Sequence, residues 1–92
     1  MAQVFIDDDE GFMRWRDEHP SGFILNTHRK PSPAYLVLHR ADCGHLKSPN
    51  PLKWTTTGYI KICSSGVNDL IQWAQKEVPG YRGLRACLSC DP

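Results

Sequence analysis

Two cysteines near the carboxyl end, Cys87 and Cys90 in the segment LRACLSCDP, restrict the folds open to this chain. A structural zinc ion takes four protein ligands in a tetrahedron, and two ligands close together in the sequence form half of such a site. The segment HRADC supplies a second pair, because three residues separate His39 from Cys43. The spacing therefore predicts one zinc ion held by His39, Cys43, Cys87 and Cys90.

Two other residues could serve as the fourth zinc ligand in place of His39. Cys63 would complete an all-cysteine site, although it stands at the end of an expected strand, and a lone cysteine is commonly a small buried hydrophobe. His45 lies closer to Cys43 than most tetrahedral ligand pairs. Other readings are thiols without metal, or a redox role for the Cys-x-x-Cys pair. A thioredoxin-like pair sits at a strand-to-helix turn, whereas this pair follows the last expected helix.

The size and ends of the chain set further expectations. Its 92 residues make one domain, residues 1–92, whose stability is marginal because a short chain buries a small share of its surface. The amino terminus, MAQVFIDDDEGF, lacks the basic and apolar regions of a signal peptide, so we expect a cytoplasmic protein with reduced thiols. No apolar run approaches the roughly 20 residues of a membrane span. The ending soon after the last cysteine pair suggests a module of a longer protein, with a fused catalytic domain or a partner protein.

Hydrophobic periodicity predicts the secondary structure. Asp7 or Asp8 can cap a first helix, which ends at His19 because a residue before proline avoids the α region. Residues 41–58 show no period and predict a long irregular connection. We therefore expect an α+β fold with a small three-stranded antiparallel sheet and two helices, stapled by one zinc ion. The other expected elements are strands over 22–27, 34–40 and 59–63, a helix from Ser64 or Ser65 to Val78, and an irregular knuckle over 81–92.

Charge is unevenly distributed along the chain. Residues 1–18 carry a net charge of −4, whereas residues 19–92, which contain all four cysteines, carry +5. A basic segment suits a polyanionic partner such as nucleic acid, because cations bind phosphates. Trp54 could stack on an exposed base or, alternatively, close over a small core. The candidate nucleic-acid-binding residues are Arg29, Lys30, Arg40, Lys47, Lys53, Trp54, Arg82 and Arg85.

The two cysteine-bearing segments resemble a known family. HRADC followed by LRACLSCDP is similar to the zinc-binding amino-terminal domain of the Ada family of DNA alkylation-repair proteins, whose pattern is C-R-x-x-C, a helix, then R-P-C-x-x-C-x-P. The likeness covers roughly residues 35–92. It implies a small α+β zinc domain that lies on DNA, with Arg40, Arg82 and Arg85 near the phosphates.

One departure from that family bears on activity. In the repair proteins the first ligand is a zinc thiolate that attacks a methyl phosphotriester, whereas this chain has His39, and an imidazole cannot accept the methyl group in that way. Four protein ligands leave no open position, so the zinc is expected to be structural and no catalytic residue is assigned.

The expected function is that of a zinc-stabilised module that binds nucleic acid, DNA in preference to RNA, as the recognition part of a nuclease, restriction or repair protein. The alternatives are a protein-interaction module and a thiolate alkyl acceptor that uses Cys43 or Cys63.

Overall fold

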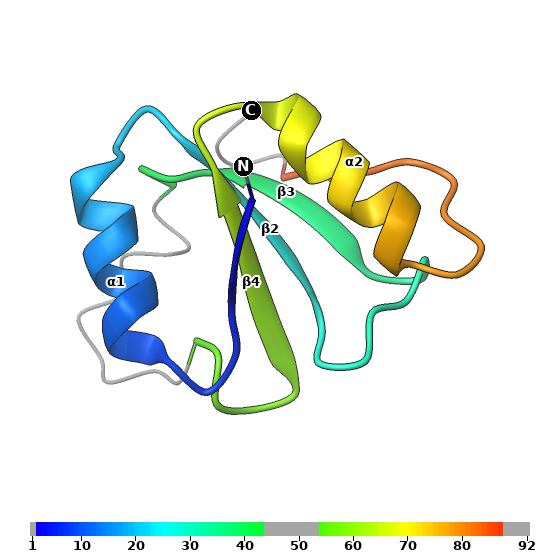
Figure 1. Ribbon diagram of the computed structural model, residues 1–92, viewed down its shortest axis with the longest axis horizontal. Helices are drawn as coiled ribbons and strands as arrows, with labels where there is room; N and C mark the ends of the chain where they lie inside the picture. The colour runs from blue at the N-terminus through cyan, green and yellow to red at the C-terminus, as the bar shows by residue number, and fades with distance from the viewer. Residues whose placement is uncertain (1, 44–53, 88–92) are drawn as a thin grey trace.

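The computed structural model describes residues 2–43 and 54–87, and within them it has two helices and five strands (Figure 1). The expected α+β class is therefore confirmed. Among the described residues, no helix is both long enough and apolar enough to cross a membrane. In chain order the elements are β1 (Gln3–Phe5), α1 (Asp9–Glu18), β2 (Phe23–His28), β3 (Leu36–Arg40), β4 (Tyr59–Ser64), α2 (Val67–Glu77) and β5 (Arg85–Ala86).

The strands form one mixed sheet in the order β1-β4-β2-β3-β5. The three expected strands are its centre, and both of their pairings are antiparallel. Expecting only three strands was wrong, because β1 extends the sheet beside β4 and β5 extends it beside β3. The pairing of β3 with β5 is parallel, and β5 lies in the segment expected to be an irregular knuckle.

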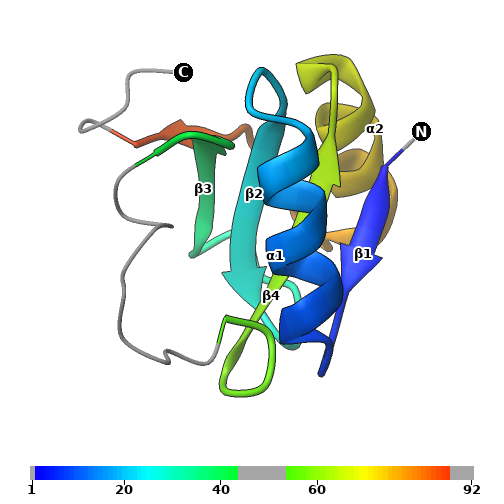
Figure 2. The same ribbon diagram turned by 90° about the vertical axis from the view of Figure 1, so that its left-hand side faces the viewer.

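The two helices cover opposite faces of the sheet, which gives three layers (Figures 1 and 2). Successive side chains of a strand point to opposite faces, so each central strand contributes to both cores. Phe12 and Trp15 of α1 belong to one buried cluster, together with Ile24. The other cluster joins Leu70 of α2 to Leu25, the next residue of the same strand. We call the first face the α1 face.

The N-cap of α1 was predicted correctly from the sequence, and that of α2 was not. Asp8 caps α1 as expected, and its carboxylate accepts a hydrogen bond from the Gly11 backbone N–H at 2.9 Å. The expected serine cap of α2 is wrong, because Gly66 is the N-cap and makes no side-chain cap hydrogen bond. Ser64 instead ends β4, and its hydroxyl donates to Asp69 at 2.7 Å.

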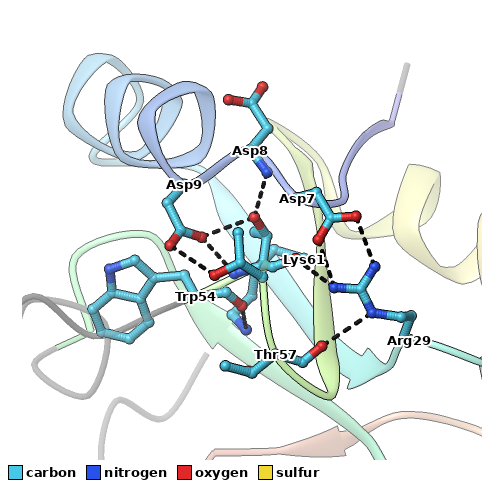
Figure 3. A network of polar contacts seen from close by, with 9 residues as sticks. Asp7, Asp8, Asp9, Arg29, Trp54, Thr57 and Lys61 are labelled. Atoms are coloured by element: carbon cyan, nitrogen blue, oxygen red, sulfur yellow. Dashed lines mark hydrogen bonds and ion pairs between the residues drawn. The ribbon is translucent and has the colours of Figure 1, made fainter.

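A network of polar contacts fixes the chain that leads into β4 against the start of α1 (Figure 3). The Asp9 carboxylate accepts hydrogen bonds from the backbone N–H and the hydroxyl of Thr55, at 2.6 and 2.8 Å. The same hydroxyl accepts from the Asp8 backbone N–H at 2.7 Å, and the Thr55 carbonyl accepts from the Asp7 N–H at 2.7 Å. Thr55 is fully buried, so these contacts satisfy polar groups that water does not reach.

Candidate metal centre and its surroundings

Three of the four predicted metal ligands lie together. His39, Cys43 and Cys87 are all buried, and their candidate ligand atoms lie within 4.8 Å of one another. The two sulfur atoms are 4.0 Å apart, which is far longer than a disulfide bond of about 2.05 Å. Two thiolates on a tetrahedral zinc, each about 2.3 Å from the metal, would be about 3.8 Å apart. The group could therefore hold a metal ion, and its sulfur–sulfur distance is close to the value expected for two thiolates on zinc.

Backbone pairing brings these three residues together. The parallel register of β3 and β5 pairs Leu38 with Ala86, and the Cys87 N–H donates to the Leu38 carbonyl at 2.8 Å. Cys87 therefore lies beside His39, the next residue of β3. The chain then turns back after β3, where the Cys43 N–H donates to the Arg40 carbonyl at 3.0 Å. An edge strand of two residues thus places one of the candidate ligands.

Cys63, the alternative fourth ligand, lies elsewhere on the same face. His39 and Cys63 both pair with Ile24, from opposite sides, so β2 separates them. Two strand spacings amount to about 9–10 Å. Cys63 is also fully buried, and burial raises the pKa of its thiol above the ordinary value of 9.0. It packs in the core as a protonated thiol. Cys90 and His45 lie outside the described residues, and Cys90 stays a prediction.

The predicted nucleic-acid contacts fall into different surroundings. Lys47 and Lys53 lie outside the described residues. Lys30, Arg40, Arg82 and Arg85 are exposed. Arg29 is exposed too, but its guanidinium forms two hydrogen bonds with the Asp7 carboxylate, at 2.8 and 3.0 Å (Figure 3). These contacts lower the pKa of Asp7. The charge of Arg29 is therefore already paired with a carboxylate of this chain.

Trp54 requires a correction. Its side chain is 8% exposed and belongs to the buried cluster of the α1 face, where its ring centroid lies 6.0 Å from that of Phe12. A ring held in this way is not available for stacking on a base. The alternative, a loop aromatic that closes over a small core, describes it better.

Lys61 is a buried cation that the sequence did not single out. Its amine donates to the Asn26 side-chain oxygen at 2.8 Å. It also donates to the Trp54 carbonyl at 2.8 Å (Figure 3). The residue is 3% exposed, and burial lowers its pKa to about 8, although the nearby groups Cys63 and Asp9 act in the opposite direction. In the sequence, Lys61 appears as the polar position of an alternating strand, which normally faces water.

Sequence reasoning also missed three rings that gather at the other end of the α1 face. His28, Tyr35 and Tyr59 have ring centroids 5.2–5.4 Å apart, and we call them the aromatic row. The guanidinium of Arg85 lies 5.7 Å from the Tyr35 ring centroid. The sequence does contain a signal for this row. Tyr35, His28 and Tyr59 each stand four residues from His39, Ile24 and Cys63, respectively, and an even spacing along a strand places side chains on the same face.

No known protein-family model, curated protein or solved structure matches this chain. The resemblance to the Ada family therefore stays a prediction, and functional interpretation depends on the residues and the geometry described above.

Proposed function

We propose that this protein is a zinc-stapled module that binds nucleic acid. The observation that carries the proposal is the buried group of His39, Cys43 and Cys87, whose ligand atoms lie within 4.8 Å of one another. The fourth ligand would be Cys90, because a Cys-x-x-Cys pair commonly places both thiolates on one zinc ion. Four protein ligands would leave no open position for water or substrate, so the zinc would hold the fold together.

The metal would hold the edge of the sheet. β5 has only two residues, so few backbone hydrogen bonds hold it to β3. A zinc ion shared by residues of both segments would fix that pairing, and in a small domain the energy of metal binding is largely folding energy. The site would thus determine where the residues around β5 lie.

Exposed cations lie in and near β5 and at the end of β3, next to the candidate metal ligands. Arg85 belongs to β5, Arg82 precedes it by three residues, and Arg40 ends β3 directly after a candidate ligand. Guanidinium groups bind phosphates well because they offer several donors in a fixed plane. Together with the net charge of +5 over residues 19–92, these cations support a polyanionic partner. The Ada-like spacing of the ligands favours DNA.

Alkyl transfer to a cysteine is not part of this proposal. The first ligand is His39 rather than a cysteine thiolate, and Cys63 is a fully buried thiol whose pKa is raised by burial. A nucleophilic cysteine needs the opposite, a lowered pKa and an accessible sulfur. A protein-interaction role has one observation in its favour, since Val4 and Ile6 are exposed in and beside the edge strand β1.

Binding of fluorescently labelled DNA and RNA, single-stranded and duplex, between 50 and 200 mM salt tests the proposal. We expect the affinity to fall steeply with salt, because bound cations release counterions from the phosphates. Arg82→Ala and Arg85→Ala should each reduce the salt slope by about one. Lys76→Ala is the matched control, since Lys76 is an exposed cation on helix α2 that is not among the candidate residues. Absence of salt-dependent binding to every probe would refute the proposal.

A further inference from the structure

The register of the central strands places the residues of the α1 face in rows. His39 and Cys63 flank Ile24 in the row at the metal end. At the opposite end of the face, Tyr59 pairs directly with His28, and Tyr35 stacks on His28 at an interplanar angle of 17°. Four residues separate the two rows along each strand, which corresponds to about 14 Å. The candidate metal centre and the aromatic row thus lie at opposite ends of one face.

Helix α1 covers the face toward the metal end. Its buried residues Phe12 and Trp15 share a core cluster with Ile24 and Cys63, whereas the rings of the aromatic row are not part of that cluster's buried set. Tyr59 is 38% exposed, and His28 and Tyr35 are half-buried. Tyr59 is tilted to the stacked pair, by 46° to His28 and 52° to Tyr35, and Tyr35 packs against the edge of the cluster. The three rings therefore form an aromatic surface, partly open to solvent, at the edge of this core.

Cations accompany the rings. The Arg85 guanidinium lies over the Tyr35 ring, and exposed Lys30 follows His28 by two residues. On the inner side, the buried amine of Lys61 lies 5.8 Å from the Tyr59 ring centroid. The charge around the rings therefore suits an anion that also has a planar apolar part. A nucleotide combines a phosphate with such a planar ring.

We propose that the nucleic acid bound by this protein is single-stranded, and that one of its bases stacks on Tyr59, supported by Tyr35 and His28, while Arg85 binds a neighbouring phosphate. This inference rests on the proposed function and names its substrate class. In a duplex the faces of the bases are hidden in the helical stack, so only an unpaired strand offers a base to an exposed ring. Tyr59 thus takes the stacking role that was predicted for Trp54.

The candidate metal centre contributes to this surface indirectly. Arg85 and Cys87 are two residues apart on the same side of the β5 segment, so one points to the aromatic row and the other to the metal group. Fixing Cys87 on a zinc ion also fixes the strand that carries Arg85. Removal of the metal would therefore weaken the binding of single-stranded nucleic acid and would also destabilise the fold.

The test uses the full zinc-loaded chain with three labelled probes: a single strand of thymidines, a strand of equal length and charge without bases, and a duplex. The wild-type protein should bind the thymidine strand more tightly than the other two. Tyr59→Leu should weaken that binding about five-fold or more, the loss expected for one stacked base, and leave binding of the base-free strand unchanged. Tyr59→Phe keeps the ring and should bind as the wild type does.

Tyr81→Leu is the matched control, since Tyr81 packs against the core cluster of the opposite face. Far-ultraviolet circular dichroism checks that each variant is folded. Equal binding of the thymidine and base-free strands, tighter binding of the duplex, or equal losses in Tyr59→Leu and Tyr81→Leu would overturn this inference and leave the proposed function standing. Failure of the wild-type protein to bind any probe in a salt-dependent way would overturn both, and would direct the search to a protein partner.

Discussion

The buried amine of Lys61 predicts an unusual dependence of stability on pH. Burial lowers its pKa from the ordinary value of 10.5 to about 8, so the folded protein releases this proton at a lower pH than the unfolded chain does. A depressed pKa in the folded state contributes stability that is fully present above pH 10.5 and is lost as the pH falls through about 8. Between these limits, the free energy of unfolding should rise with pH.

The size of the effect follows from the two pKa values. At 1.36 kcal/mol per pKa unit, the interval from about 8 to 10.5 corresponds to about 3 kcal/mol, a large share of the stability of a small domain. Replacement of Lys61 by Met removes the titration and keeps a long side chain. Cys63, whose raised pKa causes stability to fall as pH rises above about 9, is present in both proteins, so its effect largely cancels in the comparison.

Denaturant unfolding at intervals from pH 7.5 to 10.5, followed by tryptophan fluorescence, measures the difference. The wild-type protein should gain up to about 3 kcal/mol over Lys61→Met across this range. Lys76→Met, a substitution of an exposed lysine on α2, should follow the wild type. Parallel curves for the wild type and Lys61→Met would refute the reasoning, because they would mean that water reaches the amine and leaves its pKa near 10.5.

Three further predictions concern the core, the Asp9 contacts and the thiol of Cys63. Phe12→Ala should cost about 3–5 kcal/mol in denaturant unfolding, because the ring is fully buried; a loss below 1 kcal/mol would contradict its place in the core. Asp9→Ala should destabilise the protein by about 2 kcal/mol or more in the same assay, since the carboxylate accepts two short hydrogen bonds from Thr55, whereas Asp8→Ala should cost only the cap, about 1 kcal/mol. Iodoacetamide at pH 8 should leave Cys63 unmodified in the native protein and modify it in urea, as peptide mass spectrometry would show; rapid native labelling would contradict its burial.

The sequence predicted the elements that carry their own local signal. The three central strands have five or six residues and are rich in apolar side chains, and the two helices have apolar stripes. β1 and β5 have three and two residues, too few for a period of two to be visible. They form because a partner strand offers unpaired backbone groups, and this is a property of the assembled sheet.

The candidate ligands were predictable because their spacing is local, whereas the surroundings of other residues depend on register. The Cys-x-x-Cys and His-x3-Cys pairs stand out in the printed sequence, and His39 and Cys43 do lie beside Cys87. The aromatic row is visible only after the pairing of β2 with β3 and β4 is known. Whether the Trp54 side chain is buried likewise depends on where its loop packs, and no local sequence pattern determines that.

Intact mass measured under native and then denaturing conditions, on protein purified without chelator, tests the proposed zinc site. The native wild-type protein should be heavier by one zinc ion. His39→Ala and Cys90→Ser should lose the ion, and Cys63→Ser should keep it, because Cys63 lies two strands away from the group of His39, Cys43 and Cys87. Equal native and denatured masses for the wild type, or loss of zinc from Cys63→Ser with retention in His39→Ala, would contradict the zinc-stapled fold.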